Sequence, residues 1–383
     1  MAKEIIIITR HYPPEAAGGS RRPWALASGL RALGCHVRIV APLGAEDPEL
    51  MGVAHPTFPF LPDSSSIDKS TQTFGDLFRR WLLLPDPEVR WAFRCLRAIR
   101  KANLRPDWII TTSPPESLHL IGAILRTQLK CRWLADVRDL WLSSPQRKER
   151  NAKWRQVIER VIARATLARA DAFVAVSPIV LAEAESLSGQ ATPLGIVVGH
   201  FTAEHPELEP YKLPVETFNI VHTGQIELSN PLSEIDDLIS EFVELLEYKP
   251  EAVLWLAGRL SKAEMGKIAK SSAVKSIQIL GSVSIQTSRS LQAAADALVI
   301  VSGPDSHALP GKVAEYAATD RPILTVGTGP WMSLLPTGLA APFSEVRKME
   351  KGCIRSSVSK SEQMCPSEAF LNLMQKAERE SRS

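Results

Sequence analysis

The sequence lacks paired cysteines and metal-ligand spacings, and each absence excludes a class of protein. Its 383 residues include five cysteines, scattered at positions 35, 95, 131, 353 and 365. An odd number of cysteines without a C-x-x-C pair argues against a disulfide framework and a structural metal site, and it suits a reducing compartment. Cys35 and Cys131 begin strand-like apolar runs, so we expect them to fill the core rather than act as nucleophiles.

Long hydrophobic runs are missing as well, because no apolar stretch reaches the roughly 18–20 residues that a membrane-spanning helix needs. The run Ile5–Ile8 near the N-terminus is too short for the core of a signal peptide, and no small-residue cleavage site follows it. The sequence therefore predicts a cytoplasmic protein whose first apolar run is a buried strand.

Net charge is small, at +3, but it is unevenly distributed along the chain. Residues 1–200 carry 27 Lys and Arg against 19 Asp and Glu, a net charge of +8, whereas residues 201–383 carry 18 against 23, a net charge of −5. This asymmetry predicts an anionic partner for the first half. The basic residues lie on amphipathic segments without a nucleic-acid-binding motif, so we do not expect nucleic acid as the partner.

Short apolar runs alternate with longer amphipathic segments, a pattern typical of βα units and parallel sheets. The predicted strands are Glu4–Thr9, Val37–Ala41, Trp108–Thr112, Trp133–Val137, Ala172–Val176, Gly195–Val198, Asn219–Thr223, Ala252–Ala257, Ile277–Leu280, Ala297–Val301 and Ile323–Val326. Helices are expected between them, at about 19–33, 88–103, 116–129, 150–169, 178–187, 231–248, 262–271, 287–294 and 311–319, with a last helix at 367–380.

The predicted fold is α/β, with two Rossmann-like domains that face a central cleft. The N-terminal domain spans residues 1–200 and the C-terminal domain spans 217–366, with a proline-containing linker at 201–216 between them. We expect the C-terminal helix, within 367–383, to pack back on the N-terminal domain. Parallel sheets bind ligands at the carboxyl ends of their strands, so two such sheets in tandem favour a two-substrate enzyme over a structural protein.

Two segments that follow predicted strands of the N-terminal domain contain turn-forming residues. In Tyr12–Arg22, two prolines end the strand, and Gly18 and Gly19 permit close backbone approach at the start of a helix. Free N–H groups there can hold an anion or a polar group of a substrate, although an ordinary βα turn also explains the glycines. In Thr111–Ser117, the hydroxyls and prolines either face a substrate or cap the next helix.

A third segment, Asp136–Trp141, places two carboxylates around Arg138 at the end of a buried strand. A carboxylate such as Asp139 at the edge of a cleft can accept a proton or orient a hydroxyl. The alternative is an ion pair between arginine and aspartate that holds the loop.

The fourth segment, His307–Tyr316, opens a helix in the C-terminal domain. Pro310 and Gly311 expose amides at the helix start and Lys312 adds a point charge, which together suit a diphosphate. Glu315 follows one turn later, where a carboxylate can accept hydrogen bonds from two ribose hydroxyls. The alternative is that Lys312 and Glu315 form a plain surface pair.

Together the four segments resemble the GT-B glycosyltransferases of family 4, retaining enzymes that use nucleotide sugars, in particular those of bacterial surface-polysaccharide assembly. Members commonly have YPP…GG…R after the first strand, SPP after a middle strand, D-x-RDLW after the next and GK-x-x-EY-x-A-x-x-RPI in the C-terminal domain. All four occur here in that order. Val221–Gln225 resembles the strand and glycine turn that open the family's donor domain. The resemblance covers residues 1–340, and its specificity comes from the order of the motifs.

The resemblance implies that the C-terminal domain binds a nucleoside-diphosphate sugar as donor, with Lys312 at the diphosphate and Glu315 at the ribose. The implied donor-binding residues are Gly18, Gly19, Gly224, His307, Leu309, Pro310, Gly311, Lys312 and Glu315. The implied catalytic residues are Arg138, Asp139 and Lys312. Residues expected on the side of the sugar acceptor are Arg21, Arg22, Ser113 and Glu116.

Three positions depart from the family pattern. His307 stands where many members have the first glutamate of Glu-x7-Glu, and Arg138 stands where a histidine often precedes the Asp139 position. Gln225–Asn230 supplies no cation where an Arg/Lys pair is common. Stabilisation of the leaving diphosphate would then depend more on Lys312, Arg138 or the two arginines at positions 21 and 22.

The resemblance also implies metal-independent transfer with retention, without a cofactor, to a glycan or lipid-linked acceptor. Retention would follow a front-face route in which the departing phosphate helps to deprotonate the acceptor. Two alternatives stay open: a GT-B sugar epimerase that rearranges or hydrolyses a nucleotide sugar without an acceptor, and a degenerate glycosyltransferase that serves as a scaffold in a polysaccharide complex.

Two basic stretches of the first half predict peripheral contact with an anionic membrane. Arg79–Arg105 and Arg147–Arg169 each carry eight basic residues against two acidic ones, with Trp81, Trp91 and Trp154 among them. Basic residues near anionic lipid contribute on the order of 1 kcal/mol each, and exposed aromatic rings can insert at the interface. The alternative is that the aromatic residues are core and the arginines form a solvated outer face.

Overall fold

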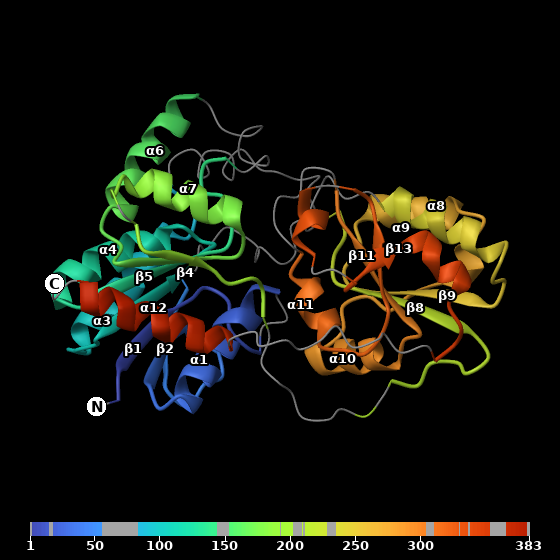
Figure 1. The fold of residues 1–383 in the computed structure, drawn as a ribbon, viewed down its shortest axis with the longest axis horizontal. Coiled ribbons are helices and arrows are strands. Elements are labelled where there is room, and N and C mark those ends of the chain that lie inside the picture. The colour runs from blue at the N-terminus through green and yellow to red at the C-terminus, as the bar shows by residue number, and fades with distance from the viewer. Residues whose placement is uncertain are drawn as a thin grey trace. The chain divides into compact units, whose positions relative to one another are not determined.

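The computed structural model describes residues 2–14, 18–55, 83–143, 153–191, 193–201, 209, 211–227, 235–303, 310–328, 330–335, 338–352 and 365–380. The chain divides into two compact units, residues 1–199 with 364–383 and residues 200–363. Each unit has its own sheet with helices around it (Figure 1). No helix of the described chain has the length and apolar character to cross a bilayer.

The first unit contains a seven-stranded sheet with the order β3-β2-β1-β4-β5-β6-β7, in which each neighbouring pair is parallel. Its strands are β1 (Glu4–Ile8), β2 (His36–Pro42), β3 (Leu50–Val53), β4 (Trp108–Thr112), β5 (Arg132–Val137), β6 (Ala172–Ala175) and β7 (Gly195–Val197). Central strands such as β4 are buried along their whole length, because helices cover both faces of a parallel sheet.

The helices of the first unit form two groups. One group is α1 (Arg21–Ala32) and α12 (Pro366–Glu380), which pack on each other. In the other, α3 (Val89–Lys101) packs on α4 (Ser117–Leu129), α4 on α6 (Lys153–Leu167) and α6 on α7 (Pro178–Ser188). The helix α12 comes from the far end of the chain, yet it lies beside α1 in Figure 1.

Polar contacts hold α12 on the first unit. Glu378 accepts hydrogen bonds from Lys3 Nζ at 2.6 Å and from Trp108 Nε1 at 2.8 Å. Arg132 Nη1 donates to the Ala377 carbonyl oxygen at 3.1 Å. These contacts tie the last helix to the starts of β1, β4 and β5.

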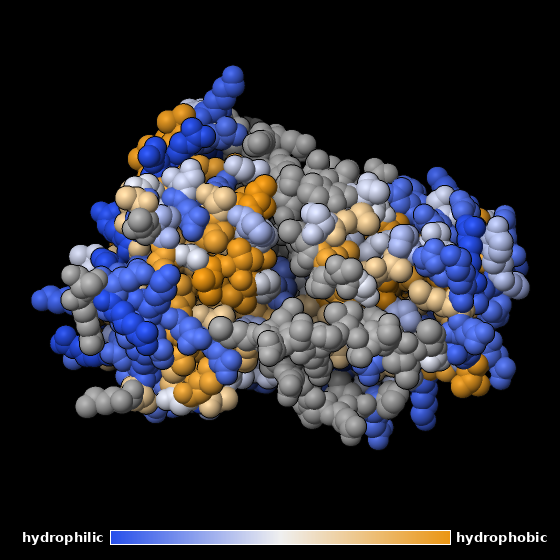
Figure 2. Space-filling model, in the orientation of Figure 1, coloured by the Kyte–Doolittle hydropathy of each residue, from blue (hydrophilic) through white to orange (hydrophobic). Residues whose placement is uncertain are grey.

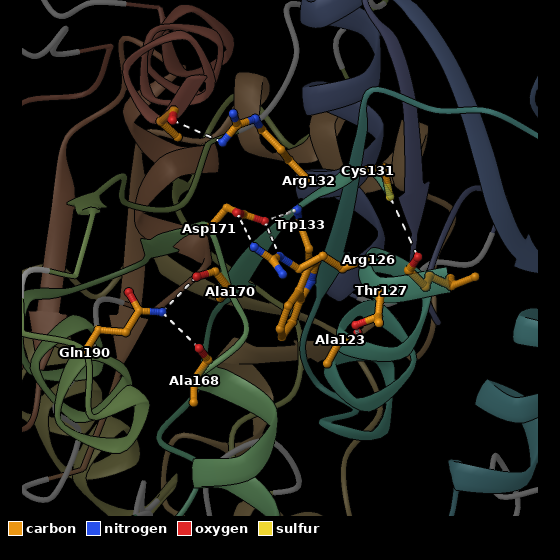
Figure 3. Close-up of polar contacts among 12 residues, drawn as sticks. Ala123, Arg126, Thr127, Cys131, Arg132, Trp133, Ala168, Ala170, Asp171 and Gln190 are labelled. Atoms are coloured by element: carbon orange, nitrogen blue, oxygen red, sulfur yellow. Dashed lines mark hydrogen bonds and ion pairs between the residues drawn. The ribbon is translucent and has the colours of Figure 1, made fainter. Parts of the chain in front are cut away.

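The amino ends of β5 and β6 carry structural polar contacts (Figure 3). Asp171 accepts two hydrogen bonds from Arg126 at 2.6 and 2.8 Å and one from the Trp133 backbone N–H at 2.9 Å. Gln190 donates to the carbonyl oxygen of Ala170 at 2.8 Å. These contacts lock helices to strand starts, at the end of the sheet opposite to where parallel sheets bind ligands.

The two cysteines that were predicted to fill the core, Cys35 and Cys131, do so. Cys131 and Cys35 are both buried, and burial raises the pKa of the Cys131 thiol to about 11 and also raises the pKa of Cys35. A thiol with a raised pKa holds its proton at neutral pH and is a poor nucleophile.

The second unit contains a six-stranded sheet with the order β10-β9-β8-β11-β12-β13. Its strands are β8 (Phe218–Thr223), β9 (Ala252–Ala257), β10 (Ile277–Ile279), β11 (Ala297–Val301), β12 (Ile323–Val326) and β13 (Ala341–Pro342). Its α-helices are α8 (Ile235–Leu246), α9 (Lys262–Lys270), α10 (Ile285–Ala294) and α11 (Lys312–Ala317). Successive residues of one strand enter different core clusters, as Ile220 and Val221 do, because successive side chains point to opposite faces of a sheet.

The described residues confirm the predicted α/β class and the predicted strands, with two differences. The short edge strands β3 and β13 were not predicted from the sequence. The first helix begins at Arg21, because Gly18–Ser20 form a separate 3-10 turn.

Candidate functional site

A buried polar network lies in the second unit where β8 ends and α11 begins. Lys312 Nζ lies 3.0 Å from Glu315 Oε2. Gln292 Nε2, from α10, donates to the same oxygen at 3.2 Å and to Thr223 Oγ1 at 2.8 Å. The Thr223 backbone N–H donates to the Tyr316 hydroxyl at 2.9 Å. The network fixes the Glu315 carboxylate between a cation and an amide.

Burial distinguishes this arrangement from a plain surface pair. The Glu315 side chain is 7% exposed, whereas that of Lys312 is 23% exposed. The Lys312 side chain is therefore more accessible to solvent than the Glu315 carboxylate. An anionic ligand that approaches from solvent meets the positive charge first.

Close backbone packing shapes the same strand ends. Gly224 has φ +115°, a conformation that side chains disfavour, and a Cβ there would lie 2.9 Å from Lys312 Cε. A Cβ on Gly258, which follows β9, would collide with the Gly224 carbonyl oxygen. The turn after β8 thus packs against the turn after β9. The Lys312 stem lies against Gly224, in the turn after β8.

The structure therefore brings together three of the predicted donor-binding residues: Gly224, Lys312 and Glu315. Pro310 and Gly311 directly precede α11, which has six residues, and the Pro310 carbonyl accepts from the Val313 N–H at 2.9 Å. His307 and Leu309 lie outside the described residues.

His222 is a buried residue of this region that was not predicted. Its Nδ1 lies 2.9 Å from the Val299 carbonyl oxygen, so Nδ1 must donate and Nε2 is left as an acceptor. Burial lowers the pKa of His222 to about 4; the Val299 contact opposes this shift and the Lys312 charge adds to it. His222 is therefore neutral at physiological pH and adds no charge to that of Lys312. Its signal in the sequence is a histidine inside an apolar run, one residue before the Thr223-Gly224 turn.

In the first unit, Arg22 forms a buried ion pair with Asp136 of β5. Arg22 Nη2 lies 2.8 Å from Asp136 Oδ1, and Nη1 donates to the carbonyl oxygens of Val198 and Gly199 at 3.0 and 2.6 Å. Burial alone would raise the pKa of Asp136, but the Arg22 guanidinium outweighs it and holds that pKa below its usual range. The pair fastens α1 to β5 and to the chain after β7.

Arg138 joins two other predicted segments. Its Nε donates to the Ser113 carbonyl oxygen at 2.5 Å and its Nη1 to the Gly19 carbonyl oxygen at 3.0 Å. A Cβ on Gly19 would lie 3.4 Å from the Arg138 guanidinium, at the edge of ordinary contact distance. Burial lowers the pKa of Arg138, and the charges of Asp136 and Asp139 oppose the shift. The predicted residues Gly19, Ser113 and Arg138 therefore lie together, with the Asp139 side chain exposed beside them.

The loop that carries Asp139 is anchored from α7. Glu183 accepts hydrogen bonds from the backbone N–H groups of Trp141 at 2.6 Å and of Ser143 at 2.7 Å. Charge-assisted bonds of this kind are about twice as strong as neutral ones. Glu183 was not predicted, because it lies 40 residues or more from its partners in the sequence.

His119 of α4 is a second histidine that was not predicted. Thr111 Oγ1 accepts a hydrogen bond from Trp133 Nε1 at 2.8 Å and also lies 2.8 Å from His119 Nδ1. Burial lowers the pKa of His119 to about 4. The ring lies about 6 Å from those of Trp133 and Trp141, and we assign it to the core below the Asp136–Arg138 segment.

A cavity of about 340 Å³ opens at the carboxyl ends of β1 and β2, lined by Arg10, Tyr12, Pro14, Pro42, Leu43, Gly44 and Ala45. Its wall is fixed by the Tyr12 hydroxyl, which donates to Asp47 at 2.6 Å, and by Arg31, which also contacts Asp47 at 2.6 Å. The residues predicted to face the sugar acceptor are instead packed in the unit, since Arg21, Arg22, Ser113 and Glu116 are each 8% exposed or less.

Within the described chain, no group of three or more His, Cys, Asp or Glu side chains is placed to hold a metal ion. Cationic side chains near the candidate sites are Lys312 in the second unit and Arg138 and Arg10 in the first.

Comparisons with known proteins agree with this architecture. A family model for a glycosyl transferase 4-like domain matches residues 17–197. A search of curated proteins gives no significant match.

Solved structures match over both units. Sucrose-phosphate synthase from Thermosynechococcus elongatus matches with a TM-score of 0.62 and 15% identity over 90% of this chain and 88% of that one. The catalytic domain of starch synthase IV from Arabidopsis thaliana, bound to ADP and acarbose, matches with a TM-score of 0.59 and 11% identity over 98% and 99%. Anabaena Alr3699/HepE in complex with UDP-glucose matches with a TM-score of 0.56 and 12% identity over 99% of both chains.

The matched domain and the shared fold confirm the resemblance to family 4 glycosyltransferases that the motifs indicated. Residues 17–197 match the model of a glycosyl transferase 4-like domain, and the chain has the two-domain fold of the GT-B glycosyltransferases.

Proposed function

We propose that this protein is a glycosyltransferase that moves a sugar from a nucleoside-diphosphate sugar to an acceptor. The observation that carries the proposal is the network at the end of β8, where the part-exposed Lys312 side chain pairs with the buried Glu315 carboxylate. The network lies at the carboxyl end of β8, and parallel sheets bind their ligands at the carboxyl ends of their strands. Two proteins of similar fold are bound to UDP-glucose and to ADP.

In this proposal, Lys312 meets the donor diphosphate and Glu315 accepts hydrogen bonds from the ribose hydroxyls. Gln292 keeps one Glu315 oxygen in place through its 3.2 Å bond, and Gly224 leaves space for the Lys312 stem. A positive group placed in advance stabilises the charge that develops on the leaving diphosphate, which is usually the largest contribution to such catalysis. Transfer would proceed with retention and without a metal ion or cofactor.

The sugar acceptor is proposed to bind on the first unit, at the cavity beside Arg10. The walls from Pro14, Pro42 and Leu43 are apolar and Arg10 is cationic, a combination that suits an amphiphilic acceptor with an anionic group, such as a lipid-linked glycan. Asp139, exposed on its anchored loop, would orient the acceptor hydroxyl, with Arg138 holding the loop against Ser113 and Gly19. The reaction would then belong to the synthesis of a surface polysaccharide or a related glycan.

A thermal-shift screen with nucleoside diphosphates and nucleotide sugars tests the donor. A ligand at 100 times its dissociation constant stabilises the fold by about 2.7 kcal/mol, which raises the unfolding temperature measurably. An unchanged unfolding temperature with every nucleotide would contradict the proposal. Conversion of a nucleotide sugar without an acceptor would identify an epimerase instead, and donor binding without turnover on any acceptor would identify a scaffold.

A further inference from the structure

Helix α6 of the first unit presents a row of apolar side chains to solvent. Trp154, Val157, Ile158 and Val161 are 46%, 62%, 40% and 62% exposed. Their spacing of i, i+3, i+4 and i+7 places them along one face of the helix. Single exposed apolar residues are ordinary, but a contiguous apolar row marks an interaction surface.

The inner face of the same helix is partly ionic, which inverts the usual pattern of a surface helix. Arg155 Nε lies 2.9 Å from Glu159 Oε1, and both side chains are less than a tenth exposed. Arg155 also donates to the Leu83 carbonyl oxygen at 3.2 Å. This ion pair is buried and α6 packs on α4 and α7, so α6 is held in the unit without using its apolar row.

A row of cations lies next to the apolar row. Lys153, Arg160 and Arg164 are exposed, and their spacing of i, i+7 and i+11 aligns them along one edge of the helix. Glu159, the single acidic residue of α6, is buried in its pair with Arg155. The outer surface of Lys153–Leu167 is therefore apolar and positively charged. Figure 2 shows hydrophobic and hydrophilic side chains adjoining over α6.

Helix α3, which packs on α4 as α6 does, adds positive charge to the first unit. Its core-facing residues are apolar, including Trp91, so that part of the predicted aromatic surface is core. The exposed residues of α3 are Arg90, Phe93, Arg94, Arg97, Arg100 and Lys101. The predicted residues 79–82 and 147–152 lie outside the described chain.

We propose that α6 docks the first unit on an anionic lipid surface. Trp154, Val157, Ile158 and Val161 enter the headgroup region, and Lys153, Arg160 and Arg164 lie at the lipid phosphates. A protein partner would also cover an apolar row, but the adjacent cations, with no exposed acidic residue on the helix, match an anionic bilayer. The docking goes beyond the proposed transfer reaction and needs neither donor nor sugar acceptor.

Flotation of the full-length protein with vesicles tests the docking. We expect the protein to float with phosphatidylcholine vesicles that contain phosphatidylglycerol, and to stay behind with phosphatidylcholine alone or in high salt. A variant with Lys153→Gln, Arg160→Gln and Arg164→Gln should lose about 100-fold in binding to the anionic vesicles, from the usual contribution of a basic residue near such a surface. Binding that is equal for both kinds of vesicle, or absent, overturns the proposal.

A second pair of variants tests the apolar row itself. Val157→Asp with Val161→Asp should abolish flotation. Met265→Asp with Val274→Asp is the control and should not, because these exposed residues (44% and 42%) belong to the second unit and not to the apolar row. Thermal unfolding in the absence of lipid should stay unchanged in both pairs.

Fluorescence identifies the inserted residue directly. Brominated lipid should quench the wild-type protein, and Trp154→Phe should remove this quenching although eight of the nine tryptophans remain. Quenching that persists in Trp154→Phe contradicts the proposal. A wild-type dimer that Val157→Asp dissociates without lipid would assign the row to a second copy of the chain instead.

Discussion

Replacing Lys312 with methionine should distinguish the contribution of the diphosphate to binding from that of the nucleoside. Lys312→Met keeps the stem that lies on Gly224 and removes the charge. We expect weaker binding of a nucleoside diphosphate and unchanged binding of the matching nucleoside, because Lys312 is proposed to contact the phosphates alone.

The size of the effect follows from the contacts that Lys312 already makes. A charge-assisted contact contributes about 1.5–3 kcal/mol, which corresponds to roughly a 10- to 150-fold change in the dissociation constant. Part of this gain is offset when a ligand draws Lys312 from Glu315, 3.0 Å away. Glu315 retains its bond from Gln292, so breaking its contact with Lys312 cancels only part of the binding free energy. We therefore expect the lower end of the range, about a 10-fold weaker affinity.

Isothermal titration calorimetry with a nucleoside diphosphate and with its nucleoside measures both quantities. Lys275→Met is the matched control, since it removes an exposed lysine from the same unit. An affinity of Lys312→Met for the diphosphate within twofold of the wild type would refute the reasoning, and so would an equal loss of affinity for the nucleoside.

Three other changes have defined outcomes. Glu315→Gln should weaken nucleoside binding in calorimetry but leave inorganic diphosphate binding equal or stronger, because Lys312 loses its intramolecular partner; equal weakening of both ligands contradicts the ribose role. Asp136→Asn leaves the buried Arg22 charge unpaired and should cost about 3–5 kcal/mol of unfolding free energy by denaturant titration; a loss below 1 kcal/mol would show that the pair is dispensable. Since the pKa of Asp136 is lowered in the folded state, this stabilisation is present above about pH 4 and is lost as the pH falls further, so the wild type but not Asp136→Asn should lose it in acid. Gly224→Ala forces a side chain into φ +115° and should lower the free energy of unfolding by about 1–3 kcal/mol; an unchanged thermal midpoint would argue against that strain.

The strands that the sequence predicted are those in which burial produces an unbroken apolar run. β1 and β4 contain such runs because both faces of the sheet are covered. The missed strands β3 and β13 lie at sheet edges, and β13 has two residues. An edge strand pairs on one side, so it can be short and mixed in composition, and it leaves a weak pattern.

The candidate site was predicted where its residues are neighbours in the sequence. Lys312 and Glu315 lie within one helical turn, so their encounter follows from local spacing. Gln292 comes from another helix, and Arg22 meets a carboxylate 114 residues away. Periodicity indicates which residues are buried but not which buried groups pair. For this reason Arg22 was expected to face a substrate, whereas its guanidinium is bonded to Asp136 and to backbone carbonyl groups.

The position of α12 has a consequence for synthesis on the ribosome. The first unit is assembled from residues 1–199 and 364–383, and Phe370, Leu373 and Met374 of α12 are core residues of that unit. At about 5–20 residues per second, the nascent first unit waits on the order of 10–30 s for its last helix while residues 200–363 emerge. In that interval the apolar side of α1 lacks its cover, and the later-made unit has time to fold. The half of the protein that is made first is therefore completed last, and the final helix closes it.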